Sequence, residues 1–441
     1  MNARAPNRVS RQPETAKITD LSHEGRGVAH VDGKTVFIDD ALPGELVEWQ
    51  RVKQGRNFDE GRLLRVLEPS PDRVDPRCAH FGMCGGCVLQ HLSGEQQLQF
   101  KQKQLMDSLT RIGKVTPQET LPPLHAGSWN YRRRARLAAR WVPKKNRTVV
   151  GFRERSTPYI TDLQRCEVLQ APLDGLIVPL SELVTALSIR NRVPQIEVAV
   201  ADNAVALVVR VLEPLTDADQ ELLRRFGREH SVQMFLQPGG YETVAPMEQF
   251  EPLEYRLPSF DLTLQFLPTD FVQVNGPLNL QMIDRAVQLL ELTPHDRVLD
   301  LFCGLGNFSL PLARRAGQVV GVEGEAGLVA RARENAARNG LGNAQFFTAN
   351  LADESIGSAL WAGKFDKVLL DPPRAGAKEV LPVVAKSGAG TVLYISCHPG
   401  SLARDAGILV HEHGYKLQSA GVMDMFPHTA HVESAALFVK P

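Results

Sequence analysis

Three short segments near the C-terminus carry residue types that could act together in one reaction. They are Asp371-Pro372-Pro373-Arg374, Ser396-Cys397-His398-Pro399, and the run from Phe426 to Glu433. The first is typical of an active-site turn after a buried strand, the second puts a thiol at a strand-to-helix junction, and the third ends in a carboxylate. A nucleophile, a base and a turn suited to a planar substrate indicate covalent chemistry on a flat ring.

Cys397 is the candidate nucleophile. It follows an apolar strand and precedes Pro399 and a predicted helix over 401–410, whose N-terminal dipole would lower the pKa of the thiol. The alternative is a small buried hydrophobe, which is a common role of cysteine, and we assign that role to Cys303 in a glycine-containing turn. Glu433 is the candidate general base, with an exposed carboxylate as its alternative.

The turn at Asp371 points to a carbon acceptor. It resembles the D/N-P-P-aromatic turn of methyltransferases that modify exocyclic amines, but Arg374 replaces the aromatic residue and Cys397 follows. C5 of uracil becomes nucleophilic only after a thiolate adds at C6, and the C5 proton must then leave to a base. These residue types therefore favour methylation of a pyrimidine carbon.

A nucleoside site is predicted upstream of these segments. Residues 298–302 form an apolar strand, and Gly304 and Gly306 after it let the backbone approach a ligand. A second strand, 319–322, ends before Glu323, whose carboxylate is placed for ribose hydroxyls. The third glycine of a dinucleotide motif and a phosphate-binding lysine are both missing, so the pattern favours S-adenosylmethionine.

Cysteine spacing predicts a metal centre. Cys78, Cys84 and Cys87 lie close together in a glycine-rich segment, and Cys166 is the remaining cysteine of the same predicted domain. A triplet with one remote ligand is typical of an iron–sulfur site, whereas structural zinc sites usually pair two C-x2-C units. A [4Fe–4S] cluster is the first hypothesis and zinc the second. The lack of a signal peptide or disulfide framework indicates a cytoplasmic protein.

Length and patterning predict a multidomain α/β protein of two to four domains. Residues 1–14 are expected to form a disordered arm. Residues 15–70 hold short strands around an Asp32-Gly33 hairpin turn, which indicates a small β-barrel of the oligonucleotide-binding kind. Such a barrel favours nucleic-acid binding, although it also occurs as a spacer.

The rest of the chain divides into a central α+β domain (71–94 and 125–265), a helical segment (95–124), and a doubly wound, Rossmann-like domain (266–441). Gly113 is expected to end the helix. Fifty basic and fifty acidic residues cancel, but Arg132–Arg136 contains four arginines, which predict either a phosphate-contacting strip or a solvated strand face. No apolar stretch is long enough to cross a membrane.

These motifs resemble the RNA uracil-C5 methyltransferases over nearly the whole chain. The barrel is similar to their TRAM domain, the cysteine quartet to their [4Fe–4S] site, and the last third to their S-adenosylmethionine domain. The resemblance implies that relatives acting on transfer RNA lack barrel and cluster, and that relatives acting on another ribosomal uracil have the cluster without the barrel. Having both then indicates an enzyme that acts on 23S ribosomal RNA, at a uridine of the uracil-1939 type. We expect the protein to be a monomer. It also implies that the helix over 95–124 packs with the catalytic domain.

The resemblance assigns roles by motif. It implies that Cys397 is the nucleophile, with His398 where the family usually has Asn, and that Glu433 is the base. It implies cluster ligands at Cys78, Cys84, Cys87 and Cys166. It implies contacts to S-adenosylmethionine from Gln273, Phe302, Asn307, Glu323, Asn350 and Asp371.

Two rival hypotheses remain. A radical enzyme would use a cluster to cleave S-adenosylmethionine, but such enzymes typically carry C-x3-C-x2-C without a fourth ligand, unlike the spacing from Cys78 to Cys87. A non-catalytic RNA-binding assembly factor would tolerate decay of the motifs around Cys397 and Glu433, which are intact. Methylation of a different ribosomal or transfer RNA uridine is a further alternative.

Overall fold

The computed structural model describes residues 12–351 and 363–441 and divides into two compact units. Unit 1 runs to Lys101 and includes Phe426–His431, and unit 2 comprises Gln102–Met425 and Val432–Pro441. Most of the predicted arm, up to residue 11, lies outside the described residues. Within the described ranges, no helix has the length and apolar character that spanning a bilayer requires.

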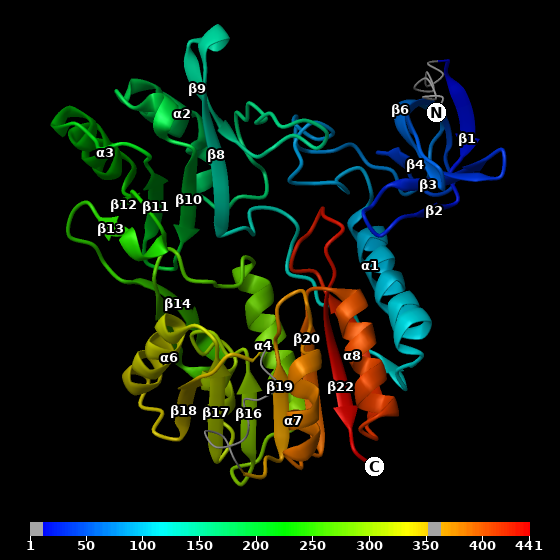
Figure 1. Cartoon of the computed structure of the whole chain (residues 1–441), viewed down its shortest axis with the longest axis vertical. Coiled ribbons are helices and arrows are strands. Elements are labelled where there is room, and N and C mark those ends of the chain that lie inside the picture. The colour runs from blue at the N-terminus through cyan, green and yellow to red at the C-terminus, as the bar shows by residue number, and fades with distance from the viewer. Residues whose placement is uncertain (1–11, 352–362) are drawn as a thin grey trace, which may run out of the picture. The chain divides into compact units, whose positions relative to one another are not determined.

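Unit 1 contains a six-stranded sheet with the order β1-β5-β6-β4-β3-β2 (Figure 1). Its strands are β1 (Glu14–Lys17), β2 (Asp20–Leu21), β3 (Gly27–Val31), β4 (Lys34–Asp39), β5 (Leu46–Gln54) and β6 (Phe58–Glu68). Alternate side chains bury a core that includes Ala29, Val36, Ile38, Val47 and Trp49. The six strands confirm the small β domain predicted from the sequence.

Glycine residues allow a tight turn and a close packing contact in this sheet. Asp32 (φ 52°) and Gly33 (φ 77°) both adopt left-handed backbone angles, as the predicted hairpin turn between β3 and β4 requires. Gly61 leaves room for Trp49, because a Cβ at position 61 would lie 2.5 Å from the indole ring. The large aromatic side chain therefore fills the core where β6 has no side chain.

The predicted helix is present and ends differently from the prediction. Helix α1 (Gly94–Ser108) continues into a π-helical turn, η1 (Leu109–Gly113). The left-handed residue after it is Lys114 (φ 55°), so the prediction that Gly113 ends the helix in this role is wrong. Gly113 is instead required by packing, since a Cβ there would lie 2.4 Å from the Ala403 carbonyl oxygen.

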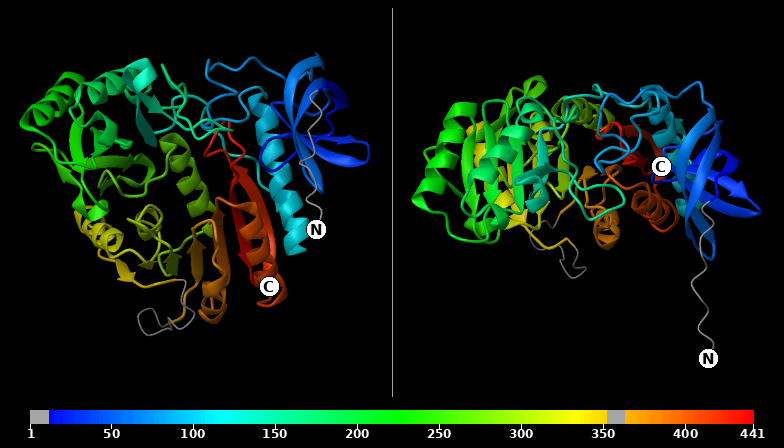
Figure 2. Two further views of the ribbon diagram at one scale, coloured as in Figure 1. Left: turned by 45° about the horizontal axis from the view of Figure 1, so that its top comes forward. Right: turned by 90° about the horizontal axis from the view of Figure 1, so that it is seen from above.

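The central part of unit 2 is built on a second six-stranded sheet with the order β13-β12-β11-β10-β8-β9. The strands are β8 (Arg134–Val142), β9 (Arg147–Gly151), β10 (Gln195–Val200), β11 (Val205–Arg210), β12 (Gln233–Gln237) and β13 (Ala245–Pro246). Helices α2 (Ile177–Ala186) and α3 (Asp217–His230) pack against each other and this sheet (green in Figure 2). A separate hairpin, β14 (Leu253–Leu257) and β15 (Leu262–Phe266), follows.

The C-terminal part of unit 2 is an eight-stranded sheet with the order β18-β17-β16-β19-β20-β22-β21-β7. Its parallel strands are β16 (Arg297–Leu301), β17 (Gln318–Glu323), β18 (Ala344–Thr348), β19 (Lys367–Leu370) and β20 (Thr391–Ser396). The antiparallel pair β21 (Lys416–Met423) and β22 (Glu433–Val439) extends it, and β7 (Glu119–Thr120) lies at the edge.

Helices accompany this sheet in the alternation expected of a doubly wound fold. They are α4 (Gly276–Leu290), α5 (Ser309–Ala313), α6 (Ala326–Arg338), α7 (Leu381–Lys386) and α8 (Pro399–His411). Helices α7 and α8 contact each other and are drawn in front of the sheet in Figure 1. The strand order reverses between β16 and β19, which is where ligands bind in open α/β sheets.

Candidate functional site

The carboxyl ends of four parallel strands and the start of β22 meet at one edge of the sheet. Leu301 of β16 pairs with Val322 of β17 and with Leu370 of β19, and Leu370 pairs with Tyr394 of β20. Ser396, at the end of β20, pairs with Ser434 of β22. Five sequence-predicted residues lie next to these paired positions, namely Phe302, Glu323, Asp371, Cys397 and Glu433, so the sheet brings five separate segments to one place.

Cys397 and Glu433 come from adjacent antiparallel strands. Because Ser396 pairs with Ser434, Cys397 and Glu433 occupy the next opposed positions. The Cys397 side chain is partly exposed, whereas Glu433 is 4% exposed. A reachable thiol therefore stands opposite a buried carboxyl group.

The environment of Cys397 differs from the prediction of a lowered pKa. Burial raises the pKa of the thiol to about 11, with further increases from Glu433 and Asp371, and Arg374 acts in the opposite direction. The helix dipole is thus outweighed by partial burial and by two carboxyl groups on neighbouring segments. The thiol is protonated in the free protein at neutral pH.

The pKa values of the nearby carboxyl groups of Glu433 and Asp371 are also raised. Burial raises the pKa of Glu433 well above its ordinary value, and Asp371 adds to the effect. Burial and the nearby Glu323 raise the pKa of Asp371 to about 7. Asp371, with a pKa of about 7, can accept or release a proton near neutral pH, and the raised pKa of Glu433 makes its carboxylate a stronger base.

The turn after β16 and the end of β17 lie next to each other, and the sequence predicts a nucleoside site there. Phe302 has a left-handed backbone (φ 65°), and its amide donates to the Val322 carbonyl at 2.9 Å. The Glu323 carboxylate accepts the Gly304 amide at 3.2 Å and the Gly324 amide at 2.6 Å. The carboxylate therefore holds both turns together at the sheet edge.

Asn307 lies in a polar network that the sequence did not predict. Its Oδ1 accepts from the Tyr255 hydroxyl at 3.0 Å and from Asn279 Nδ2 at 2.9 Å, and its Nδ2 donates to Asn279 Oδ1 at 3.0 Å. These bonds fix the amide's orientation and leave one N–H for a ligand. Tyr255 and Asn279 had no sequence signal, because their partner lies 52 and 28 positions away.

The two remaining predicted contacts lie on loops. Gln273 is half-buried in the segment before α4, where the Arg133 amide donates to the Val274 carbonyl at 2.8 Å and Asn275 caps the helix. Asn350 is exposed and follows β18, at the same edge as Glu323. Asn350 therefore lies near the carboxyl ends of β17 and β18, whereas the role of Gln273 stays a prediction.

Three arginines of the strip are paired with acidic side chains; Arg133 and Arg134 are largely buried, and Arg136 is exposed. Arg133 is 8% exposed and pairs with Asp202 at 2.9 Å. Arg134 and Arg136 both pair with Glu197, at 3.8 and 3.0 Å. These partners neutralise much of the charge, so the structure does not favour a continuous phosphate-contacting strip.

The cysteine segment has the chemistry of a cluster loop. Cys78, Cys84 and Cys87 are partly exposed in unit 1, and the Gly86 amide donates to the Cys84 sulfur at 3.4 Å. Cys166 is buried in unit 2. Within the described ranges, no group of three or more His, Cys, Asp or Glu side chains is arranged as a metal site. The donor types fit an iron–sulfur cluster, and the quartet stays a prediction.

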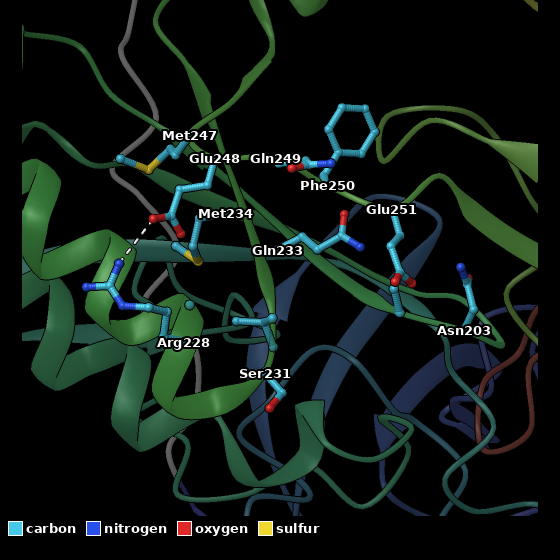
Figure 3. A pocket seen from close by; sticks show the side chains of 13 residues that line it. Asn203, Arg228, Ser231, Gln233, Met234, Met247, Glu248, Gln249, Phe250 and Glu251 are labelled. Carbon is cyan, nitrogen blue, oxygen red and sulfur yellow. Dashed lines mark hydrogen bonds and ion pairs between the residues drawn. The ribbon is translucent and has the colours of Figure 1, made fainter.

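A cavity of about 310 Å³ lies in the central part, beside α3 and β12 (Figure 3). Its lining includes Arg228, Glu248 and Glu251, and Arg228 is paired with Glu248 at 3.1 Å. None of the predicted site residues lines it. Its charge is net acidic, which does not suit an RNA phosphate.

Two family models match the chain. Residues 255–441 match a model described as tRNA (Uracil-5-)-methyltransferase, and residues 10–53 match the TRAM domain. The second match confirms the type of the N-terminal β domain.

One solved structure is similar over almost the whole fold. The tRNA (uracil-54, C5)-methyltransferase of Pyrococcus abyssi, in complex with S-adenosyl-L-homocysteine, has a TM-score of 0.75 at 24% identity and covers 96% of this chain and 99% of its own. The uncovered part is smaller than the barrel. The expectation that relatives acting on transfer RNA lack the barrel is therefore wrong, and the fold alone does not separate the two RNA classes.

Full-length relatives show the family. A Xanthomonas axonopodis pv. citri (strain 306) protein named 23S rRNA (uracil(1939)-C(5))-methyltransferase RlmD is 53% identical and covers 99% of both chains. The Stenotrophomonas maltophilia (strain R551-3) protein of that name is 52% identical and covers 99% of this chain and 100% of its own. With such identity over its whole length, the chain belongs to the RNA uracil-C5 methyltransferase family.

Proposed function

We propose that this protein uses S-adenosylmethionine to methylate C5 of a uridine in 23S ribosomal RNA, the uracil-1939 named in its relatives. The observation that carries the proposal is the opposition of Cys397 and Glu433 at the paired ends of β20 and β22. A nucleophile and a base on neighbouring strands can act on adjacent ring carbons of one flat base.

In this proposal Cys397 forms a bond from Sγ to C6 of the uracil, and the electron pair moves to the C4 carbonyl as an enolate. S-adenosylmethionine supplies the methyl group that C5 takes. Glu433 then accepts the C5 proton, the electron pair of that C–H bond forms the C5–C6 double bond, and the Sγ–C6 bond breaks with the sulfur leaving as a thiolate. The raised pKa of Glu433 supports its role, because a carboxylate that binds a proton tightly is a stronger base.

The raised pKa of Cys397 has a consequence for the first step. The thiol needs to lose its proton when the substrate binds, and two carboxyl groups that titrate high, Glu433 and Asp371, lie within electrostatic range. In the absence of RNA, Cys397 is a thiol and not a thiolate in this proposal. The target base must also leave its stack to meet the sulfur, since neither ring face is accessible within a helix.

For the cofactor, we propose contacts from the side chains at the sheet edge. Glu323 would bind the ribose hydroxyls, because its carboxylate oxygens keep lone pairs beyond those that accept the amides of Gly304 and Gly324. Asn307 would donate its remaining N–H. The other proposed contacts are Gln273, Phe302, Asn350 and Asp371.

We also propose that Cys78, Cys84, Cys87 and Cys166 hold a [4Fe–4S] cluster. Three thiols in one segment and a backbone amide that donates to the Cys84 sulfur support this. A cluster would cross-link the segments that bear its ligands. The barrel, a TRAM domain, would bind RNA, and the substrate would place the protein in the cytoplasm, where we expect a monomer.

The test is methyl incorporation into unmodified 23S ribosomal RNA, with transfer RNA as the comparison substrate. The Cys397→Ala variant should lose incorporation while S-adenosylmethionine still binds, as followed by calorimetry. Retained turnover would refute the covalent mechanism. Incorporation into transfer RNA alone would instead reassign the substrate.

A further inference from the structure

Helix α8 contacts the Asp-Pro-Pro-Arg turn through three side chains on one face. Ser401, Arg404 and Asp405 are spaced as neighbours on a helix surface, and each bonds to the backbone of the segment 374–377. Ser401 Oγ lies 3.0 Å from the Arg374 carbonyl oxygen, Arg404 Nη2 donates to the Ala375 carbonyl at 2.8 Å, and the Ala377 amide donates to Asp405 Oδ2 at 2.7 Å. We call these three side chains the α8 clamp.

Asp405 is the centre of the α8 clamp. The residue is 0% exposed, and besides the Ala377 amide it accepts the Tyr394 hydroxyl at 2.7 Å and Arg404 Nε at 2.8 Å. Burial of Tyr394 and the neighbouring Asp405 raise the pKa of the phenol, so it stays a donor. A buried carboxylate needs such a set of donors, and removing one leaves a costly unpaired group.

The turn itself is shaped for this contact. Gly376 has φ 90°, and a Cβ there would lie 2.5 Å from Arg404 Nη2 and 2.6 Å from Asp405 Oδ2. The backbone at Gly376 therefore lies directly against the Arg404 and Asp405 side chains, in a conformation that glycine adopts at no steric cost.

The α8 clamp lies next to the ends of β19 and β20, the strands that lead to Asp371 and Cys397. Tyr394 pairs with Leu370, the last residue of β19 before Asp371, and β20 continues from Tyr394 to Cys397 and into α8. The ladder sets the spacing of the two strands but ends before either functional segment. Beyond the last pair, the hydrogen bonds described between residues 374–377 and α8 are those of the α8 clamp, and Ala377 also packs in the apolar core with Leu402 and Ala403.

From these contacts we propose that Asp405, supported by Tyr394, is a positioning residue that holds the Asp371–Arg374 turn at a set distance from Cys397. The inference rests on the proposed function for its catalytic meaning. Asp405 touches neither substrate nor cofactor in this scheme. It orders the turn through the Ala377 amide so that a flipped base fits between turn and sulfur.

The test compares Asp405→Asn and Tyr394→Phe with a matched control, Tyr415→Phe. Tyr415 is also a buried tyrosine of the same hydrophobic core, but its hydroxyl donates to the Ala389 carbonyl at 2.8 Å, away from the turn. Tyr394→Phe keeps the test decisive if Asp405→Asn does not fold. Hydrogen exchange of peptides covering 371–377 and the kcat and KM for RNA methylation are measured in the full-length protein.

Asp405→Asn and Tyr394→Phe should both make the turn amides exchange faster and lower kcat about tenfold, with KM for RNA nearly unchanged. Tyr415→Phe should change neither quantity even if it lowers the melting temperature. Unchanged exchange, or faster exchange with wild-type kcat, would overturn the proposal. If the wild-type protein forms no methylated product, the proposed function fails, whereas unaltered exchange in the variants would refute the clamp itself.

Discussion

Glu433, the first residue of β22, stands next to the Ser396–Ser434 pair that ends the ladder between β20 and β22, and across from Cys397, which directly follows β20. The two side chains enter the site from strands that run in opposite directions. The ladder between β20 and β22 ends directly beside these two residues and therefore sets the spacing of their backbones. Because the base and the nucleophile are on different segments of the chain, each can be substituted while the other stays in place.

Glu433→Gln should let a covalent RNA–protein adduct accumulate, because Cys397 can still add to the ring while the C5 proton has no acceptor. Denaturing gels with labelled RNA would show the adduct as a shifted band. Glu412→Gln, a change to an exposed carboxylate after α8, serves as the control and should turn over normally. An absence of adduct together with normal methylation would remove Glu433 from the mechanism.

Alkylation of Cys397 should depend steeply on pH. Burial, Glu433 and Asp371 raise the pKa of the thiol to about 11, so its thiolate fraction should grow about tenfold per pH unit between pH 7 and 9. Glu433→Gln removes a charge that raises this pKa and should speed alkylation at a given pH. Mass spectrometry of the Cys397 peptide after iodoacetamide treatment measures both. A rate that levels off below pH 9 would contradict the raised pKa.

His398 should be replaceable by Asn but not by Ala. Its Nδ1 accepts the Ser401 amide at 3.1 Å, which makes it the N-cap of α8 directly after Cys397. Asn offers the same acceptor, whereas Ala should cost about 1 kcal/mol of stability and slow methylation. Thermal unfolding and initial rates check this. Equal stability of the Ala and Asn variants would show that the cap contributes nothing.

Tyr255→Phe should weaken S-adenosylmethionine binding about fivefold, because Asn307 loses one of the donors that orient its amide. RNA affinity should stay unchanged. Tyr159→Phe, at an exposed tyrosine in unit 2, is the control. Calorimetry with the cofactor decides the outcome, and equal dissociation constants for both variants would exclude a positioning role for Tyr255.

Iron analysis tests the proposed cluster without any activity measurement. Protein prepared without oxygen should contain about four iron ions per chain, and serine at Cys78, Cys84, Cys87 or Cys166 should lower that number. Cys303→Ser should keep the iron, because Cys303 lies in the turn after β16. Zinc in place of iron would favour the second hypothesis for these cysteines.

The parallel strands could be predicted because buried strands are uninterrupted apolar runs. Residues 298–302, 319–322 and 391–395 each match a strand of the structure. The pairing of β20 with β22 could not be predicted, since its register depends on segments 38 positions apart at Ser396 and Ser434. Cys397 and Glu433 were therefore identified by residue type and family motif, and their opposition is a structural result.

The pKa of Cys397 depends on residues that are distant in the sequence. The sequence reveals the helix that follows the thiol, so a lowered pKa was expected. It does not reveal that Asp371 and Glu433 approach from other strands, or how far the sulfur is buried. The same holds for Asp405, whose partners Ala377 and Tyr394 belong to two other elements.

The edge strand β7 has a consequence for protein engineering. Residues 119–120 pair with β21, Leu121 donates its amide to Ala420, and Gly421 has no side chain where Leu121 crosses it. Leu105, Leu109 and Val115 also belong to the core around α8. A chimera that exchanges RNA-binding regions between relatives must keep residues 105–124 with the methyltransferase half. A fragment beginning at 266 would expose an unpaired edge and precipitate.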